Sequence, residues 1–446
     1  MTDAQDSNWA KARSSIVWML AIVVAFGAVW WIEKESGKEL IAKTAAPPLP
    51  TLASSKDVPA DPAPRPLTAD ELRYAKTAWT YFENNTDKTT GLTGAVDGFA
   101  GTTMWDAGSA LMALLSAHEL GLVDKARFDE RMSRALASLA KLPLYAASLP
   151  NKSYDIRTLE MTDYNNKPSP NGVGWSAIDV GRLMVPLTTI AWRHPQHTPQ
   201  ARAVIARWKT GQLARGGQLF GMQAGTDGQA PQSLQEGRLG YEQYAARTFY
   251  LLGLDVEQAL DWRPHLKLVD VEGVQVPVDA REPAKFGAQN FVVSEPFMLT
   301  GLELGFTGSG REAAWRVYRA QEARWRKTQQ LTAVTEDHVD RAPWFVYNAV
   351  HSNGRNWVAA SDKGEEAAAL RNVSTKAAFA WHALYRNEYT QKLVAAVAPL
   401  NDPAKGWYAG LYEQGGQPNK AIAANTNAVI LESLAYTTRG TLLSPR

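Results

Sequence analysis

Two glutamates lie in polar connections that each lead into an apolar helical segment, and carboxylates in such places can catalyse hydrolysis. Glu236 stands in SLQEGRLGYEQY and Glu413 stands in GWYAGLYEQGG. Cleavage of a glycosidic bond needs one protonated carboxyl group that assists the leaving oxygen and one ionised carboxylate that activates water or attacks carbon. We predict Glu236 and Glu413 as this catalytic pair. The alternative is that Glu236 stabilises the start of a helix and Glu413 is a surface acid.

Three other carboxylates are alternative catalytic residues. Asp106, in TMWDAG, falls in the first turn of a predicted helix, where it binds a sugar hydroxyl or complements the helix dipole. Glu336 and Asp337 stand beside His338 in VTEDHVD, and a dense ionisable cluster between apolar residues suits an acid/base catalyst with a shifted pKa. Adjacent residues rarely converge on one ion and no H-E-x-x-H spacing occurs, so we predict no metal.

Asp179 is interpreted as a structural residue. It lies inside a predicted helix, three positions before Arg182, and Arg238 stands at the start of another such helix. We expect Asp179 to form an ion pair with one of these two arginines.

Aromatic side chains supply the predicted binding surface. The chain has 16 Trp and 15 Tyr residues, and rings with a polar end can cover the face of a sugar. Several fall at loop ends or in the first turns of predicted helices, together with polar residues that can bond hydroxyl groups. The predicted substrate-binding residues are Trp105, Tyr164, Asn165, Trp175, Tyr241, His338, Trp407, Tyr408 and Asn425.

These residues must be positioned by helices of two kinds. Strongly apolar helical segments begin near Thr102, Gly174, Gly237, Ser294, Ser374 and Asn425. More polar helical segments alternate with them, at 68–84, 124–142, 198–213, 256–262, 311–329 and 387–398. Ser, Thr, Gly or Asn near most starts is typical of helix capping.

The lengths of the connections predict how these helices are arranged. Links from an apolar helix to the next polar one are only a few residues long, which makes the two helices antiparallel neighbours. The return connections are long, and we expect short strands within 213–235 and 269–293. We therefore predict an all-α fold, an (α/α)6 toroid with long rim loops and small β-hairpins, in which the loops emerge at the N-termini of the inner helices. The alternative is an irregular helical bundle or solenoid.

The N-terminal part predicts a membrane anchor. Residues 15–32, SIVWMLAIVVAFGAVWWI, form an uncharged apolar run long enough to cross a bilayer as a helix. No small-x-small cleavage pattern follows, which favours an uncleaved anchor over a signal peptide. We predict a short tail at 1–14, a transmembrane helix at 15–32, a Pro-rich linker at 33–66 and one catalytic or binding domain at 67–446.

Composition excludes several classes of protein. The chain has 446 residues and no Cys, so it holds no disulfide framework and no Cys nucleophile. The formal charge of +2 gives no footprint for nucleic acid. The sequence has no P-loop, no dinucleotide-binding glycine motif that opens a helix and no G-x-S-x-G elbow, so we predict no cofactor.

The motifs resemble a bacterial family of domains of unknown function, DUF3131. The strings GTTMWDAGSALMAL, MTDYNNKP, GWSAIDVGRL, LQEGRLGYEQYAAR, NFVVSEPF, STKAAFAW and ANTNAVILESLAY carry the resemblance. The family is similar to glucoamylase-like (α/α)6 glycosidases, near endo-β-1,2-glucanases. In those toroids the general acid and base occupy loops in the same topological places as Glu236 and Glu413. One departure is Ala409, where the family pattern GWYEG has an acid.

The resemblance and the carboxylates in the predicted rim loops together imply a glycoside hydrolase or transglycosylase. We expect a single-pass protein of the bacterial inner membrane whose large domain lies in the periplasm and acts on an oligo- or polysaccharide, a β-glucan or exopolysaccharide for example. The second hypothesis is a saccharide-binding or assembly protein without catalysis, acting with polysaccharide synthesis or export proteins. A polysaccharide lyase is the third, for which His338, Tyr164 and Arg238 are poor candidates.

Overall fold

The computed structural model describes residues 34, 49–225, 228–286 and 289–443. The chain divides into two compact units, Met1–Pro50 and Thr51–Arg446, and the second one is described here. The anchor predicted at 15–32 lies outside the described residues. Among the residues that are described, no helix is long and apolar enough to span a bilayer.

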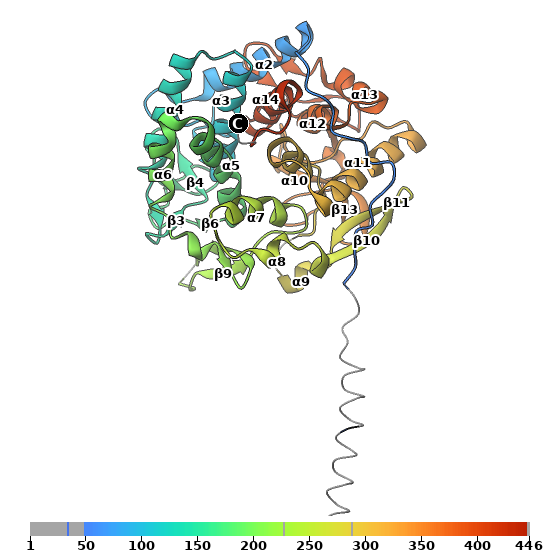
Figure 1. Ribbon diagram of the computed structural model, residues 1–446, viewed down its shortest axis with the longest axis horizontal. Coiled ribbons are helices and arrows are strands. Elements are labelled where there is room, and N and C mark those ends of the chain that lie inside the picture. The colour runs from blue at the N-terminus through green and yellow to red at the C-terminus, as the bar shows by residue number, and fades with distance from the viewer. Residues whose placement is uncertain (1–33, 35–48, 226–227, 287–288, 444–446) are drawn as a thin grey trace, which may run out of the picture. The chain divides into compact units, whose positions relative to one another are not determined.

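The apolar helices form a ring in the described part of the chain. In chain order they are α3 (Met104–Glu119), α5 (Ala177–Arg193), α7 (Tyr241–Leu251), α10 (Glu295–Leu299) with its continuation Thr300–Leu304, α12 (Thr375–Tyr385) and α14 (Ala424–Arg439). Each packs against the next, and α14 packs against α3, so the ring closes (Figure 1). These are the six apolar segments predicted from the sequence.

The more polar helices lie outside this ring. They are α2 (Ala69–Asn85), α4 (Lys125–Leu139), α6 (Thr198–Ile205), α8 (Glu257–Leu260), α11 (Gly308–Thr328) and α13 (Glu388–Val397). Among them α6 packs on α5, α8 on α7 and α13 on α12, each on the inner helix that precedes it in the chain. Shorter helical turns are α9 (Pro283–Phe286), Pro195–His197, Thr210–Gln212, Arg263–His265 and Ala368–Leu370. The arrangement is consistent with the predicted (α/α)6 toroid.

Side-chain caps fix where the inner helices begin. The hydroxyl of Thr103 accepts a hydrogen bond from the Asp106 N–H, and that of Ser176 accepts one from the Asp179 N–H. Ser374 caps α12 in the same way. Because a cap satisfies N–H groups that have no partner within the helix, it sets the first turn of each helix. The residues of these first turns are therefore held at one end of the ring. We call this end of the ring, with the loops that lead into it, the rim.

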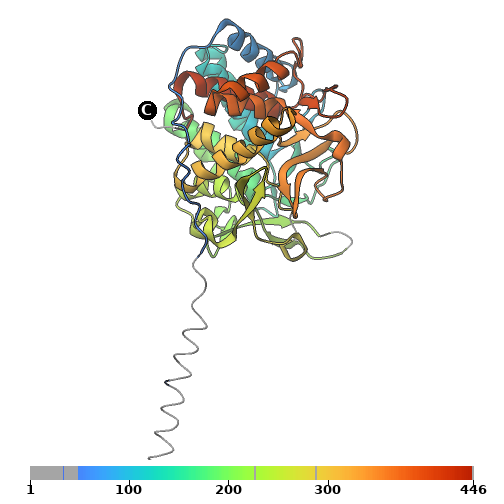
Figure 2. The same ribbon diagram turned by 90° about the vertical axis from the view of Figure 1, so that its right-hand side faces the viewer.

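The rim loops carry the strands. As predicted, 213–235 contains β7 (Ala214–Arg215), β8 (Gln218–Gln223) and β9 (Gln232–Gln235), and 269–293 overlaps the hairpin of β10 (Leu266–Val271) and β11 (Val274–Asp279). An antiparallel sheet that the sequence did not predict is formed by β12 (Glu336–His338), β13 (Phe345–Ser352) and β14 (Arg355–Ala360). In Figure 2 the loops and strands gather on the side of the domain away from the C-terminus.

Shorter strands complete the rim. Those before α5 are β1 (Gly101–Thr103), β2 (Leu144–Tyr145), β3 (Leu149–Pro150), β4 (Ser153–Asp155), β5 (Met161–Thr162) and β6 (Gly174–Trp175). Those near the end of the chain are β15 (Asn372–Ser374), β16 (Asn401–Asp402), β17 (Gly406–Trp407), β18 (Gly410–Tyr412) and β19 (Pro418–Asn419). They join loops that are distant in sequence, as β15 pairs with β18.

A buried ionic cluster joins the inner helices. The Arg182 guanidinium of α5 is 0% exposed and binds Glu303 and, at 2.7 Å, Glu432 of α14. The Tyr244 hydroxyl of α7 donates to Glu303 at 2.6 Å. Asp179 was predicted to form an ion pair with Arg182 or Arg238. The prediction was wrong for Arg182, because this arginine pairs with Glu303 and Glu432 instead. Arg238 instead donates to Gln235 and to backbone carbonyls.

Residues 51–66, within the predicted linker, lie along the domain. Their side chains are short or polar, yet they make specific contacts with α11 and the end of α14. We call this segment the strap. Its contacts are Ser55 to Glu312 at 2.6 Å, Asp57 to Trp315 at 3.1 Å, Asp61 to Arg311 at 2.6 Å, and the Arg65 N–H to the Thr437 carbonyl at 2.9 Å.

Removing the strap is expected to lower the melting temperature of the domain. The strap covers part of α11, and Leu52 and Val58 pack against the hydrophobic core, so a protein beginning at residue 67 would expose apolar surface. The measurement compares thermal unfolding of fragments 51–446 and 67–446. Equal melting temperatures would mean that the strap contacts contribute no stability.

Candidate active site

Asp179 and Glu236 form a carboxylate pair at the start of α5. The Glu236 carboxylate accepts a hydrogen bond from the Ala177 N–H in the first turn of that helix. Its place depends on Gly221 of β8, because a Cβ atom at that position would lie only 2.7 Å from Glu236 Oε2. Asp179 is partly exposed in the same first turn and has no ion-pair partner among the described residues.

The electrostatics of this pair favour a bound proton. Burial and the negative charge of Glu236 raise the pKa of Asp179 to about 7. Burial also raises the pKa of Glu236, which Lys152 partly opposes. A carboxyl group whose pKa is raised by burial and by a neighbouring negative charge holds its proton to a higher pH than a free carboxyl group does. The pair can therefore donate a proton, which a general acid must do.

A second group of charges is centred on Glu295 in the first turn of α10. Its carboxylate is completely buried and accepts hydrogen bonds from Trp105 Nε1 at 3.2 Å and from Asn425 Nδ2 at 2.6 Å. Lys376 of α12 forms an ion pair with its other oxygen. Glu295 therefore ties together the first turns of α3, α10, α12 and α14. Sequence reasoning missed this residue, and the available signal was a lone Lys376 in the apolar stretch STKAAFAW.

Glu336 and Asp337 lie on β12 beside this group. Asp337 accepts a hydrogen bond from Ser374 Oγ at 3.1 Å, and its second carboxylate oxygen has no partner among the described residues. Burial raises the pKa of Asp337 well above its usual value, and Lys376 opposes the shift. Burial also raises the pKa of Glu336. Both alternative catalytic residues thus lie on β12, and burial shifts the pKa of each upward.

Tyr347 of β13 is influenced by charges from both carboxylate groups, the one at the start of α5 and the one around Glu295 and Glu336. Burial raises the pKa of its hydroxyl, and the negative charges of Glu336 and Asp179 raise it further. Both carboxylate groups therefore influence this one hydroxyl group. Tyr347 was not predicted, because its position follows from the unpredicted sheet, in which it pairs with Glu336.

Asp106 lies in the first turn of α3. Its carboxylate accepts a hydrogen bond from Thr103 Oγ1 at 2.6 Å, and the free N–H groups of the helix start favour its negative charge. Its charge acts on both Asp179 and His338. Burial lowers the pKa of His338, so this imidazole is neutral at pH 7. Asp106 therefore lies between the α5 side and the β12 side of the rim.

The structure does not bring Glu413 together with Glu236. Arg324 of α11 binds the Glu413 carboxylate through both oxygens, at 2.6 and 2.9 Å, and Arg371 approaches it at 3.5 Å. Glu413 is therefore held by α11 and by the segment before β15, and no described hydrogen bond or ion pair joins it to Glu236. These contacts give no support to the prediction of Glu236 and Glu413 as the catalytic pair. Ala409, at the place of the missing acid, is fully buried.

The predicted binding residues divide into three sets. Trp105 and Tyr241 are partly exposed at the rim, their ring centres 5.6 Å apart, and Tyr164 is 61% exposed. Asn165 is exposed in a turn where its N–H bonds the Asp163 carboxylate. Trp175 and Trp407 are buried, the latter at 0% exposure between Tyr74 and Phe379, so their prediction as sugar-binding residues was wrong. Tyr408 packs partly on the core, and Asn425 binds Glu295.

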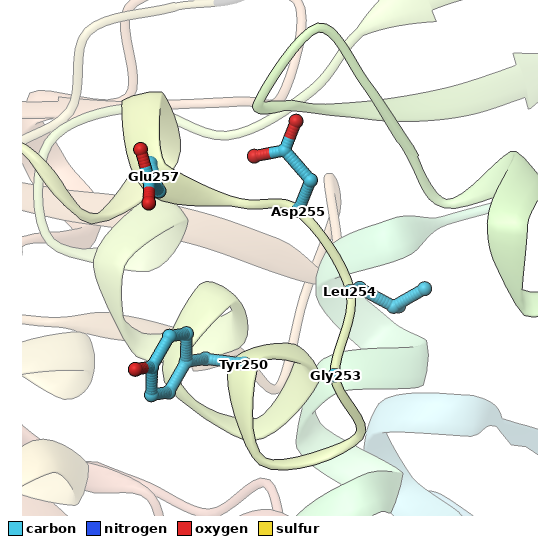
Figure 3. A pocket seen from close by; sticks show the side chains of 5 residues that line it. All are labelled: Tyr250, Gly253, Leu254, Asp255 and Glu257. Atoms are coloured by element: carbon cyan, nitrogen blue, oxygen red, sulfur yellow. The ribbon is translucent and has the colours of Figure 1, made fainter.

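The described residues form no metal-binding group, and the cavity described next lies away from the rim. Among the described residues, no three His, Asp or Glu side chains are grouped to hold a metal ion. A cavity of about 670 Å³ lies where α7 ends, away from the rim, lined by Tyr250, Gly253, Leu254, Asp255 and Glu257 (Figure 3). Asp255 lies in the loop after α7, and Glu257 is the first residue of α8 (Figure 3).

Comparisons with known proteins give a family and a fold. The family model described as protein of unknown function (DUF3131) matches residues 73–440, which confirms the resemblance drawn from the motifs. No curated protein matches.

Solved structures share the fold at low sequence identity. A candidate glucoamylase from Bacteroides fragilis is 14% identical with a TM-score of 0.60, over 86% of this chain and 94% of that one. An endo-β-1,2-glucanase from Chitinophaga pinensis, bound to sophorotriose and glucose, is 14% identical with a TM-score of 0.59, over 84% and 94%. A Glu-to-Gln variant of an endo-β-1,2-glucanase from Talaromyces funiculosus, bound to β-1,2-glucan, is 12% identical with a TM-score of 0.52, over 84% of each chain.

Proposed function

We propose that this chain, which belongs to the DUF3131 family, is a glycoside hydrolase or transglycosylase that acts on a β-linked glucan or related exopolysaccharide. The observation that carries the proposal is the Asp179–Glu236 pair, which holds a proton near neutral pH on the rim of the toroid. The fold shared with endo-β-1,2-glucanases supports the choice of substrate class.

In this mechanism Asp179 is the general acid and Asp106 is the second carboxylate. Asp179 gives its proton to the glycosidic oxygen as the bond to the anomeric carbon breaks, and Glu236 keeps the proton on Asp179 beforehand. Asp106, which Thr103 holds in the first turn of α3, accepts a proton from the attacking water or attacks the carbon itself. Tyr241 and Trp105 offer partly exposed rings for the sugar bound beside these acids.

The pH dependence of kcat/KM follows from this assignment. A general acid must be protonated, and the pKa of Asp179 is about 7, so activity is expected to fall as the pH rises through about 7. The same raised pKa makes the folded protein bind this proton more tightly than the unfolded chain. Stability from this group is therefore lost as the pH rises through about 7, and Asp179→Asn should melt higher than the wild type at pH 8 but not at pH 4. A flat profile of kcat/KM from pH 6 to 9 would contradict the assignment.

The direct test is cleavage of soluble glucans. We would incubate the chain with β-1,2-, β-1,3- and β-1,4-linked glucans and measure new reducing ends and chain-length distributions, the latter to detect transglycosylation. Asp179→Asn, Glu236→Gln and Asp106→Asn should each lose turnover and retain glucan binding. Cleavage that survives in all three variants would contradict the proposed residues.

A second candidate function is saccharide binding without catalysis. It is favoured by the loop before α14, where Ala409 is buried and Arg324 binds Glu413 through both carboxylate oxygens. In that case the rim acids bond hydroxyl groups only. Glucan binding by the wild type with no new reducing ends in any reaction would favour this function.

Anchoring and location are part of the proposal. The apolar run at 15–32 supports a single-pass protein of the bacterial inner membrane with residues 51–446 in the periplasm, where polysaccharide synthesis or export proteins would be its partners. Fusing alkaline phosphatase after residue 446 tests the orientation, since this enzyme is active only in the periplasm. An inactive fusion that is expressed at a normal level would place the domain in the cytoplasm.

A further inference from the structure

Trp344 is an exposed indole on the strand pair that carries part of the candidate site. It ends the turn between β12 and β13, directly before Phe345, and is 63% exposed. Phe345 pairs with His338 across the two strands, with the two ring centres 5.1 Å apart. His338 in turn lies within the electrostatic influence of Asp106 and Lys376. Trp344 therefore belongs to the same hairpin as Glu336 and Asp337.

The backbone of Trp344 has an unfavourable conformation. Its φ angle is +73°, in the left-handed region that bulky residues rarely adopt. Such a conformation persists only where surrounding contacts impose it, and it occurs mostly at sites of function. A surface tryptophan without a role would be replaced at no cost by glycine or asparagine, which tolerate this φ.

The turn is held by bonds at both of its ends. The Trp344 N–H bonds the Arg341 carbonyl at 2.8 Å, and the Trp344 carbonyl accepts from the Val339 N–H at 3.0 Å. Asp340 accepts hydrogen bonds from the Tyr412 hydroxyl at 2.7 Å and from the Lys420 N–H at 3.0 Å. The loop before α14 therefore fixes the backbone of this turn from the other side.

We propose that Trp344 is a stacking platform for a pyranose ring of a neutral β-glucan chain, at a subsite beside the rim acids. The inference rests on the proposed function for the identity of the chain. Glucose rings in such a polymer have apolar C–H faces and no charge, which suits a flat indole with its face in solvent.

The test measures glucan affinity apart from cleavage. Binding of soluble β-1,2-, β-1,3- and β-1,4-glucans is measured by calorimetry in the full-length protein carrying Asp179→Asn. We expect Trp344→Ala to weaken binding of at least one glucan by roughly threefold to tenfold, and Trp344→Tyr to restore most of it. Trp192→Ala is the matched control, because Trp192 is 47% exposed at the far end of α5. Trp344→Gly should bind as weakly as Trp344→Ala but melt at a higher temperature.

The outcomes separate this inference from the proposed function. Loss of binding in Trp344→Ala, with no cleavage by the wild type, would support the platform and reject the hydrolase. Unchanged binding in Trp344→Ala, or no binding of any of these glucans, would overturn the platform. A lower melting temperature for Trp344→Gly than for the wild type would also overturn it, because the indole would then be stabilising its own turn.

Discussion

Asparagine in place of Asp179 is expected to lower kcat on the cleaved glucan by roughly 10²- to 10⁴-fold, the usual contribution of a general acid. The amide has nearly the same shape but no transferable proton, so the affinity for glucan should change little. The loss should appear in kcat, because the proton is needed only as the bond breaks. The measurement is steady-state kinetics with reducing-end detection, together with calorimetry of glucan binding.

Asp255→Asn is the matched control for this substitution. Asp255 is also an acid beside an inner helix, but it lines the cavity at the far end of α7. Its replacement should leave kcat unchanged. Full activity in Asp179→Asn would remove this residue from the mechanism and move the proton donor to Glu336 or Asp337, whose pKa values burial also raises.

Methionine in place of Arg182 is expected to lower the free energy of unfolding by about 3–5 kcal/mol, because it leaves two buried glutamates without their cation. Glu303 and Glu432 are both 0% exposed and no water can replace the guanidinium. The pKa of Glu432 is already raised by burial, and without Arg182 the protonated form would dominate. Urea-induced unfolding at pH 7 measures the loss.

Two further variants show whether the loss comes from unpaired charge. Arg73→Met removes an arginine whose ion pair with Asp70 is 64% exposed on both sides, and it should cost less than about 1 kcal/mol. Adding Glu303→Gln and Glu432→Gln to Arg182→Met should recover part of the stability. If the triple variant is no more stable than Arg182→Met, the packing of the long arginine side chain is the main contribution.

The helices were predictable because their signals are local. Apolar stretches with capping residues such as Thr103, Ser176 and Ser374 predicted the inner helices to within a few residues, and the short links predicted their antiparallel partners. The hairpin around Glu272 and Gly273 follows from similar local signals. The match to DUF3131 confirmed the motifs read from the same segments.

The site was predicted only in part because its contacts are not local. Arg324 and Glu413 lie 89 positions apart, and Lys376 and Glu295 lie 81 apart, so nothing in the neighbouring sequence reveals either pair. Asp179 was assigned to a nearby arginine by spacing, whereas Arg182 points to glutamates 121 and 250 positions away. Aromatic type alone also failed to separate the buried Trp407 from the exposed Trp344.

The strap determines where a pulling force enters the domain. The chain reaches the domain near Arg316, which donates to both the Ala53 carbonyl and the Gln275 carbonyl of β11, and only later begins its first helix, α2. Tension on the N-terminal side would load the ion pairs of α11 as a shear before it reached α2.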